Sequence, residues 1–328
     1  MYSLFGFSPE NKPTLAISQC LMGDNVRFNG GHKQSRYCTD VLSEYFNFLP
    51  ICPEVEIGMG VPREPIRLIG TDRGVEVVSS SDSSKVYTQS LRDLADKKIP
   101  LLSSVAGYIF MQKSPSCGVE RVKVYNAKNH PQWTSAGIYS ERVMARLPLL
   151  PVEEAGRLMD APLRENFVMR VYLYAHWQKL QQASGFTAKG LLEFHQSIKL
   201  LVMAHNFEVY RALGNWLSCL KGRDLSQVAH RYFELLMHGL SKPATRKHHA
   251  NVLARLQGFL GKSLSVSERV ELTEVIAQYR KGIMPLVAPL LLIRHHLRLR
   301  EDDKVAQYVL SQRYMNPYPL ELGLRNAI

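Results

Sequence analysis

The sequence of 328 residues has few cysteines, no long hydrophobic run and no repeated or low-complexity segment. Its five cysteines are a small and odd number, which argues against a disulfide framework. The longest apolar stretch, residues 284–293, is much shorter than the roughly 20 residues of a transmembrane helix. The N-terminus also lacks the charged start and long apolar run of a signal peptide. We therefore expect a cytoplasmic protein that has no membrane partner.

Basic residues are abundant and unevenly distributed. The net charge is +12, of which residues 1–164 contribute +2 and residues 165–328 contribute +10. The second half also contains nine of the eleven histidines. A strongly basic region beside a nearly neutral one predicts a polyanionic partner, most often a nucleic acid.

The first half of the chain alternates short apolar runs with helical patterns, which is typical of βαβ units. This alternation predicts an α/β domain with a mainly parallel sheet and Rossmann-like layers. The segment 61–80 predicts a local hairpin that turns at Asp72-Arg73-Gly74. The predicted strands are 14–19, 47–52, 66–69, 74–79 and 105–111, and the predicted helices are 35–46, 84–98 and 137–147.

From about residue 150 onward, helical periodicity replaces this alternation. We therefore expect a domain of residues 1–150, a proline-containing linker at 151–164 and an all-α domain of residues 165–328. The predicted helices of this domain are 164–184, 188–205, 207–221, 224–240, 244–260, 266–281, 285–299 and 302–314.

Cys20, Cys52 and Cys117 each lie in a glycine- or proline-rich turn close after an apolar run. The carboxyl ends of parallel strands share one edge of a sheet, so these turns are expected to meet in the ligand-binding crevice. The thiols could be metal ligands, separate buried side chains or a nucleophile. Without CxxC pairing they do not suit structural zinc, but three isolated thiolates suit a [4Fe-4S] cluster with one iron left open. Cys38 and Cys219 fit helical patterns, and Cys219 is predicted to be a packing residue.

Other side chains in the same turns could bind a ligand or carry out chemistry. Cationic side chains could bind a phosphate, and hydroxyl and carboxylate groups could handle protons. Simpler roles are also open: Glu54 could pair with Arg63 or cap a helix, and the serines could satisfy a proline turn. The residues in question are Arg27, Lys33, Glu54, Arg63, Lys113, Ser114 and Ser116.

Three ordered motifs, CLMG…VRFNGGHK, CPEV…VPR and KSPSCG, resemble the TudS-like thiouracil desulfidase family over about residues 14–150. The second half, which includes LLEFHQSIKLLVMAHN, resembles a companion domain, and the two-domain arrangement resembles the RudS type of desulfidase. The resemblance implies a [4Fe-4S] cluster on Cys20, Cys52 and Cys117. Val26 stands where many members have a further cysteine, and Asn29 stands where many have an aspartate.

The resemblance also implies the removal of sulfur from a thiolated pyrimidine, with Glu54 and Ser114 as catalytic residues. Glu54 would act as a general acid or base, Ser114 would hydrogen-bond the base or the water, and Lys113 would stabilise negative charge. The candidates for substrate or phosphate binding are Arg27, Lys33, Arg63 and Ser116.

Basic side chains of the second half suit phosphate contacts along structured RNA, although they could also be solvated helix faces. They indicate tRNA that contains 4-thiouridine as the substrate. Small thiopyrimidines in a salvage reaction, or a non-catalytic iron–sulfur sensor that binds nucleic acid, are the alternatives. His195 and His205 are predicted to lie in the core. The predicted RNA-binding residues are Lys242, Arg246, Lys247, Arg280, Lys281, Arg294, Arg298 and Arg300.

Overall fold

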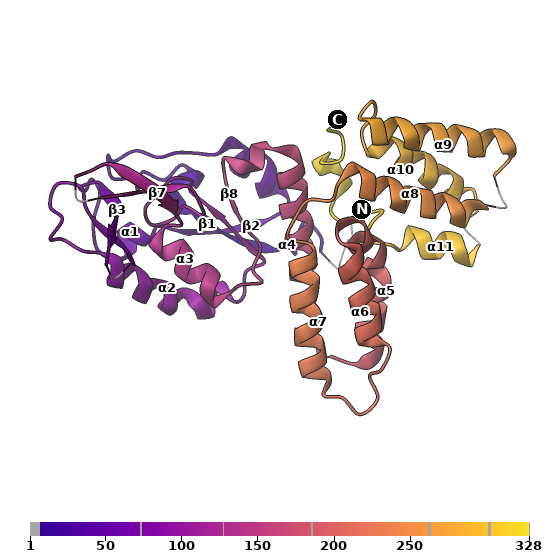
Figure 1. Ribbon diagram of the computed structural model, residues 1–328, viewed down its shortest axis with the longest axis horizontal. Helices are drawn as coiled ribbons and strands as arrows, with labels where there is room; N and C mark the ends of the chain where they lie inside the picture. The colour runs from indigo at the N-terminus through magenta and orange to yellow at the C-terminus, as the bar shows by residue number, and fades with distance from the viewer. Residues whose placement is uncertain are drawn as a thin grey trace. The chain divides into compact units, whose positions relative to one another are not determined.

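The computed structural model describes residues 7–72, 74–126, 128–184, 186–261, 264–300 and 303–327. The chain divides after Asp160 into two compact units, an α/β unit and a helical unit (Figure 1). This arrangement confirms the predicted fold class, because a parallel sheet is followed by a region of helices alone. Within the described ranges, no helix is long and apolar enough to cross a membrane.

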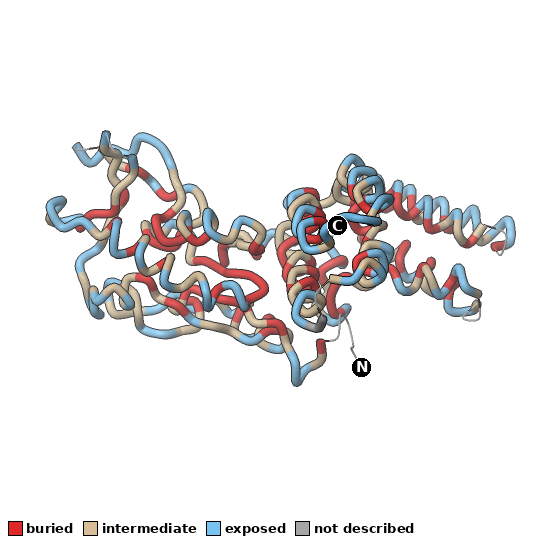
Figure 2. The backbone as a smooth tube through the Cα atoms, turned by 90° about the horizontal axis from the view of Figure 1, so that it is seen from below, coloured by how far each residue is buried: buried red, intermediate tan, exposed pale blue. Residues whose placement is uncertain are grey.

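A parallel sheet forms the centre of the α/β unit. Its strand order within the described residues is β2 (Asn47–Ile51), β1 (Thr14–Ser18), β5 (Gly107–Phe110) and β8 (Val152–Glu154). Each neighbouring pair is parallel. The two central strands are almost completely buried, which explains why they read as continuous apolar runs (Figure 2). Because β2 and β5 flank β1 on opposite sides, their carboxyl ends enclose a crevice where such sheets bind ligands.

Three helices accompany this sheet: α1 (Pro53–Glu56), α2 (Thr88–Leu102) and α3 (Ile138–Arg146). Helices α2 and α3 lie side by side (Figure 1). The Asp96 carboxylate on α2 accepts hydrogen bonds from Arg142 and Arg146 on α3, and these bonds lower the pKa of Asp96 to about 2. This contact links the two helices, and α3 begins directly behind the loop that contains Cys117.

A second, mixed sheet was not expected. Its order is β4 (Gly74–Ser79), β3 (Ile66–Thr71), β6 (Val122–Tyr125) and β7 (Pro131–Ser135). The pairs β3/β4 and β6/β7 are antiparallel, whereas β3 and β6 run parallel. A Cβ atom at Gly70 would lie 2.5 Å from the Trp133 ring, so only glycine fits beneath this side chain. The predicted hairpin is present as β3 and β4, although Arg73 of its turn lies outside the described residues.

Several elements differ from the expectation. The predicted helix at 35–46 contains a π-helical turn, Tyr37–Val41, and a 3₁₀ turn, Leu42–Glu44. The predicted linker at 151–164 contains β8 and the first turn of a long helix. Strands as short as β6 and β8 have too few residues to show a periodic pattern, and their pairing across the sheet determines them instead.

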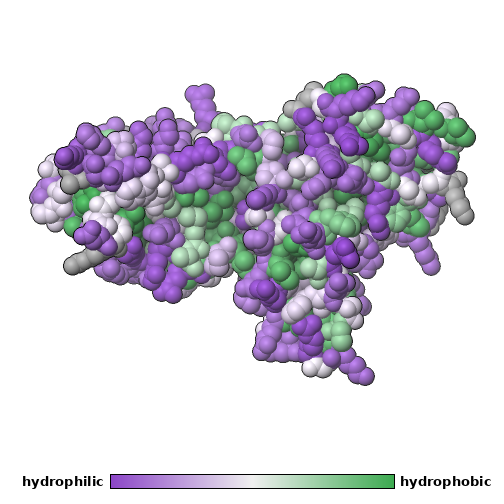
Figure 3. Space-filling model, in the orientation of Figure 1, coloured by the Kyte–Doolittle hydropathy of each residue, from purple (hydrophilic) through white to green (hydrophobic). Residues whose placement is uncertain are grey.

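The helical unit contains eight α-helices in its described part. The Trp177 ring is central to its core, stacking on Phe233 at a centroid distance of 4.5 Å and packing edge-on against Phe194. Polar side chains cover most of the face of this unit that Figure 3 shows. The helices are α4 (Ala161–Ser184), α5 (Ala188–His205), α6 (Phe207–Leu217), α7 (Leu225–Gly239), α8 (Arg246–Leu260), α9 (Val266–Lys281), α10 (Val287–Arg298) and α11 (Lys304–Leu310).

Candidate functional site

The three cysteines of the predicted site surround one cavity of about 500 Å³ at the carboxyl edge of the parallel sheet. Cys20 lies in a 3₁₀ turn that directly follows β1. Cys52 is the N-cap residue of α1 and directly follows β2, and Cys117 lies in the loop that follows β5. Three neighbouring strands therefore each deliver one thiol to the same crevice, as the strand-end argument predicts.

The loop that contains Cys117 is held from behind by the N-terminus of α3. The N–H groups of Ile138 and Tyr139 donate to the carbonyl oxygens of Pro115 and Ser116. A Cβ atom at Gly137 would lie 2.6 Å from the Ser116 backbone, so this close approach requires glycine. The first N–H groups of α3, which have no partner within the helix, thus fix the cysteine loop.

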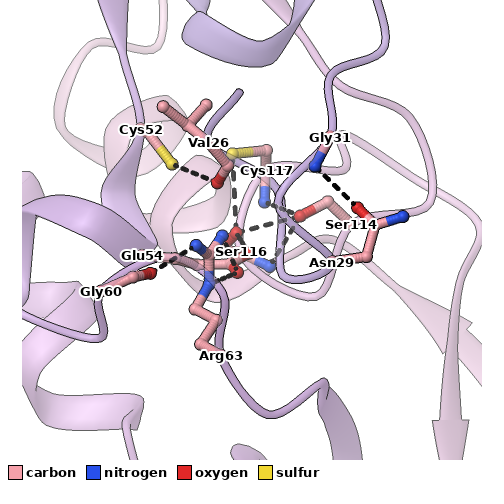
Figure 4. A network of polar contacts seen from close by, with 10 residues as sticks. All are labelled: Val26, Asn29, Gly31, Cys52, Glu54, Gly60, Arg63, Ser114, Ser116 and Cys117. Atoms are coloured by element: carbon pink, nitrogen blue, oxygen red, sulfur yellow. Dashed lines mark hydrogen bonds and ion pairs between the residues drawn. The ribbon is translucent and has the colours of Figure 1, made fainter. Parts of the chain in front are cut away.

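A hydrogen-bonded network connects the second and third cysteine loops (Figure 4). Glu54 Oε2 accepts from Arg63 Nε at 2.9 Å and from Arg63 Nη2 at 2.7 Å. Glu54 Oε1 accepts from Ser116 Oγ at 2.6 Å, and Ser116 Oγ also lies 2.9 Å from Ser114 Oγ. Ser114 Oγ accepts from the backbone N–H of Cys117 at 3.2 Å. The carboxylate is therefore fixed in position beside the cysteine loop.

The network leaves Glu54 one position for a further hydrogen bond. Each carboxylate oxygen offers two lone pairs. Arg63 occupies both positions on Oε2, whereas Oε1 accepts only from Ser116 among the described residues. The Glu54 side chain is 13% exposed and lines the cavity. Its Oε1 atom can therefore accept a proton from a molecule bound there.

The cysteine thiols are poor acids in this environment. Burial raises the pKa of Cys20 to about 11, and the neighbouring Cys52 adds to this effect. Burial also raises the pKa of Cys52 and that of Cys117, in the second case with a contribution from the Glu54 carboxylate. All three thiols line one cavity, and a metal that binds them must displace their protons.

Three thiols that come from separate strand ends are a donor set that fits an iron–sulfur cluster. A single ion requires all its thiolates at about 2.3 Å from one centre, as in zinc sites. A cluster takes one thiolate per iron, so its ligands lie further apart and can come from separate strands.

The rim of the cavity is cationic and carries one exposed aromatic ring. Arg27, Lys33 and Lys113 line the cavity, and both lysines are exposed. The Phe28 ring is 39% exposed, and the Arg27 guanidinium lies 5.6 Å from its centroid. Lys113 has a left-handed backbone with φ of 59°, which is uncommon for a residue with a side chain. This rim suits a planar ring that carries a negative group.

Two residues expected to bind substrate have other partners. The Arg63 side chain is 5% exposed and donates to Glu54 and to the Gly60 carbonyl oxygen. Ser116 is completely buried and donates to Glu54. Both residues therefore position the carboxylate, and the pairing of Glu54 with Arg63 that the sequence left open is present.

The two positions that depart from the family pattern have structural contacts. The Cys52 thiol donates to the carbonyl oxygen of Val26 at 3.8 Å. Asn29 Oδ1 accepts from the Gly31 N–H at 3.2 Å and so braces the turn at the cavity rim. Neither contact requires a thiol at position 26 or a carboxylate at position 29.

The sequence reasoning missed two residues of this site. Ser18, at the end of β1, accepts a hydrogen bond from the Met111 N–H at 2.9 Å and so ties β1 to the chain after β5. Phe28 lines the cavity although its position in a polar turn suggested no role. An exposed aromatic side chain between a cation and a glycine turn was the available signal.

Comparison with known proteins agrees with this site. The model of the 2-thiouracil desulfurase family matches residues 15–155, which include all three cysteines and the Glu54 network. Residues 15–155 belong to the 2-thiouracil desulfurase family. Residues 199–319 match a second family model, described as a protein of unknown function, DUF1722. The chain therefore joins a desulfurase region to a DUF1722 region.

Two curated proteins and one solved structure are similar to this chain. The uncharacterized protein YbgA of Escherichia coli K12 is 30% identical over 164 residues, covering 50% of this chain and 94% of YbgA. The uncharacterized protein YbbK of Bacillus subtilis 168 is 29% identical over 113 residues, covering 32% of this chain and 72% of YbbK. The solved structure is the [4Fe-4S]-dependent thiouracil desulfidase TudS, with 25% identity and a TM-score of 0.37; the match covers 48% of this chain and all of TudS.

The helical unit places five of the predicted RNA-binding residues near one end of the helix pair α8 and α9. A Cβ atom at Gly282, just after α9, would lie 2.6 Å from Arg246 Nη1 at the start of α8. The two helices are therefore antiparallel, with the start of α8 beside the end of α9. We call the following exposed residues the basic cluster: Lys242, Arg246, Lys247, Arg280 and Lys281.

The remaining predicted RNA-binding residues differ in their surroundings. Arg294 Nη2 donates to the Met315 carbonyl oxygen and to Asn316 Oδ1, so this side chain ties α10 to the C-terminal segment. Arg300 pairs with Asp303 at 2.9 Å, whereas Arg298 is exposed. Contacts within the protein therefore hold Arg294 and Arg300, and RNA binding by these three arginines stays a prediction.

Three residues outside the site also have defined surroundings. Cys38 is buried and lies in the π-helical turn Tyr37–Val41. Cys219 is exposed beyond the end of α6, so the expectation that it packs inside a helix is wrong. His195 Nδ1 lies 3.0 Å from the Tyr232 hydroxyl, and burial lowers the pKa of His195 to about 4.

Proposed function

We propose that this protein is a [4Fe-4S]-dependent desulfidase that converts 4-thiouridine in tRNA to uridine and releases sulfide. The observation that carries the proposal is the cavity in the desulfurase region, where three thiols from separate strands meet a fixed carboxylate. Soft thiolates suit an iron–sulfur cluster, and the carboxylate suits proton transfer beside it. Membership of the 2-thiouracil desulfurase family supports the reaction class.

The overall reaction exchanges one heteroatom and needs no oxidant or reductant. Water supplies oxygen to the ring carbon, the carbon–sulfur double bond becomes a carbon–oxygen double bond, and sulfur leaves as sulfide with the two protons of the water. Cys20, Cys52 and Cys117 would bind three irons of the cluster, and the fourth iron would be a Lewis acid for the thiocarbonyl sulfur. The protein must then position the ring, activate the water and move its protons.

Glu54 is the residue we assign to proton transfer. Its Oε1 atom accepts only from Ser116 among the described residues and would take a proton from the attacking water. Arg63 holds Oε2 with two hydrogen bonds, so the carboxylate keeps its orientation while Oε1 exchanges protons. The same carboxyl group can then return the proton to the departing sulfur.

The other polar residues have supporting roles in this proposal. Ser114 holds the Cys117 N–H and orders the Glu54–Ser116 pair, and it would hydrogen-bond the base or the water. Lys113 would stabilise negative charge that develops on the ring, since it lines the cavity and is exposed. Arg27 and Lys33 would bind a phosphate next to the thiolated base.

RNA as the natural substrate is supported by charge. A free base needs no second region with a net charge of +10. The basic cluster presents five exposed cations that can contact phosphates of a folded RNA. The target base must be unstacked before its C=S group can enter the cavity.

The test compares three substrates with the full chain reconstituted anaerobically. 4-Thiouracil, 4-thiouridine monophosphate and thiolated tRNA are each incubated with the protein, and loss of the thiocarbonyl absorbance is followed. We expect the largest kcat/KM with thiolated tRNA. A larger kcat/KM with the free nucleotide would instead support a salvage enzyme for small thiopyrimidines. If the cluster-loaded protein turned over none of the three substrates, the result would support a non-catalytic iron–sulfur sensor.

A charge variant separates RNA binding from chemistry. Replacing Lys247, Arg280 and Lys281 together with glutamine should lower kcat/KM for thiolated tRNA and reduce its dependence on salt, since each lost phosphate contact lowers the salt slope by about one. The kcat/KM for 4-thiouracil should not change. An equal loss for both substrates would contradict a role of the helical unit in RNA binding.

A further inference from the structure

The helical unit contains a polar cavity of about 180 Å³, separate from the cysteine site. Residues of α4, α5, α8, α9 and the C-terminal segment line it. The polar residues on its walls include Glu165, Asn166, His205, Arg246, His249 and Arg325. Asn166, His249 and Arg325 are each more than nine-tenths buried, so the polar wall is built into the core of this unit.

Contacts within the protein hold most of these polar groups in fixed positions. Arg325 Nε donates to Glu165 Oε1 at 2.8 Å, and the Tyr318 hydroxyl donates to the same oxygen at 2.9 Å. Arg325 Nη1 donates to the Tyr314 carbonyl oxygen. The Glu165 carboxylate is thus neutralised by its own arginine, and this pair adds no net charge to the cavity.

Arg246 also lines the cavity, and its positive charge has no ion-pair partner among the described residues. Among the described residues, no carboxylate lies within 4.0 Å of its guanidinium, which packs against Gly282. His205 and His249 do not add to or cancel this charge at neutral pH, because burial lowers the pKa of both. With Glu165 and Arg325 paired, Arg246 is the remaining charge among the described residues that line the cavity.

One histidine also offers a hydrogen bond to a ligand. His249 Nδ1 lies 2.9 Å from the Tyr314 hydroxyl, which leaves Nε2 for another partner. When the hydroxyl donates to Nδ1, Nε2 carries the ring proton and is a donor. A guanidinium and an imidazole N–H on one wall are suitable donors for an oxyanion.

The surroundings of the cavity favour a phosphate over a carboxylate. Arg246 belongs both to the cavity wall and to the basic cluster, whose other members are Lys242, Lys247, Arg280 and Lys281. The exposed cations of this cluster attract a dianion more strongly than a monoanion. A phosphate monoester is such a dianion near neutral pH.

The small size of the cavity favours a phosphate at the end of a molecule over one within a chain. Its volume is close to that of the roughly 150 Å³ cavity that binds benzene in an engineered protein. An internal phosphodiester carries a chain on both sides and fits a cavity of this size less well than a terminal phosphate, which carries a chain on one side only. We propose that this cavity binds a terminal phosphate monoester, either the 5′ end of an RNA or a free nucleotide.

The test uses the full chain and short single-stranded RNAs of unmodified bases, so the outcome does not depend on desulfidase chemistry. Two RNAs of the same sequence, one with a 5′-phosphate and one with a 5′-hydroxyl, are titrated by fluorescence anisotropy. Uridine 5′-monophosphate and uridine serve as competitors. We expect about tenfold tighter binding of the phosphorylated RNA if the RNA end is the ligand. If the two RNAs bind equally and uridine 5′-monophosphate competes whereas uridine does not, the cavity is assigned to free nucleotides.

Three variants assign the effect to this cavity. Arg246→Gln should abolish the phosphate-dependent difference, whereas the matched control Lys247→Gln should weaken both RNAs equally and keep their ratio. Ala244→Leu narrows the cavity without changing its charge and should also abolish the difference. The proposal is overturned if the native protein shows no phosphate-dependent binding, or if either cavity variant retains it while folded by circular dichroism.

Discussion

Replacing Glu54 with glutamine separates the catalytic role of this residue from its structural role. Glutamine keeps a carbonyl oxygen that can accept from Arg63, and its amide group can donate to Ser116 Oγ. The side chain can therefore stay in the position that its hydrogen bonds of 2.6–2.9 Å define. What the substitution removes is the negative charge and the ability to take a proton.

The substitution should affect stability and catalytic rate to different degrees. Breaking a buried ion pair costs about 3–5 kcal/mol when one partner is removed, and Arg63 is only 5% exposed. Because the glutamine oxygen still accepts from Arg63, we expect the free energy of unfolding to fall by about 2–3 kcal/mol. That loss leaves most domains folded. The rate per bound iron should fall by about 10²–10⁴-fold, which is the usual contribution of a general acid or base.

Glu56→Gln is the matched control, since it makes the same change two residues further along α1. Glu56 Oε2 pairs with Lys98 Nζ at 2.6 Å, but these side chains are 31% and 23% exposed. Such a pair is worth at most about 1 kcal/mol, and Glu56 does not line the cavity. Both variants are compared by urea unfolding, iron content and loss of thiocarbonyl absorbance. A Glu54→Gln variant that binds iron and turns over at the native rate would refute the proton-transfer role.

Three other perturbations test separate parts of the structure. Gly137→Ala should lower stability by about 1–3 kcal/mol and reduce iron retention, because its Cβ would meet the Ser116 backbone at 2.6 Å; unchanged iron content would contradict the bracing of the cysteine loop. Phe28→Ala should raise KM for a thiolated pyrimidine about tenfold if the ring stacks on the base, with little change in kcat; unchanged KM would exclude stacking. His205 has its pKa lowered to about 4 by burial, so the unfolded chain binds its proton first and stability falls as pH drops below about 6.5. His205 should contribute about 2 kcal/mol to this loss between pH 7 and 5 by urea unfolding, and His205→Gln should remove that contribution while those of His195 and His249 remain; a variant with the same pH dependence as the native protein would contradict the assignment.

The α/β unit could be predicted where buried strands are long enough to show a pattern. β1, β2 and β5 each have an apolar core, and their order in the chain places the following turns at one edge of a sheet. The short strands β6 and β8 could not be found this way, because four or three residues carry no periodic signal. Their pairing depends on β3 and β5, which are distant in sequence.

The residues of the site could also be predicted from the sequence, but not the hydrogen bonds between them. The turns around Cys52 and Cys117 indicate which side chains are near the thiols. The candidates that line the cavity are Glu54, Arg63, Lys113, Ser114 and Ser116. Whether Arg63 contacts substrate or Glu54 depends on how its side chain is directed after the turn at Gly60. Here the guanidinium is directed inward and donates to both Gly60 and Glu54. The spacing of residues in the sequence does not determine the direction of this side chain. The role of Arg63 in positioning Glu54 therefore becomes evident only from the structure.

The division of the three thiols among β1, β2 and β5 has a thermodynamic consequence for the proposed cluster. No two of these cysteines lie on one local segment, since more than thirty residues separate each from the next along the chain. An unfolded chain therefore presents no preformed site, and only the assembled sheet brings the thiols to one cavity. A group that binds the folded state alone stabilises it by mass action. Since burial raises the pKa of the thiols, cluster binding must also release their protons. Loading the cluster should thus stabilise the α/β unit, and this stabilisation should weaken as the pH falls.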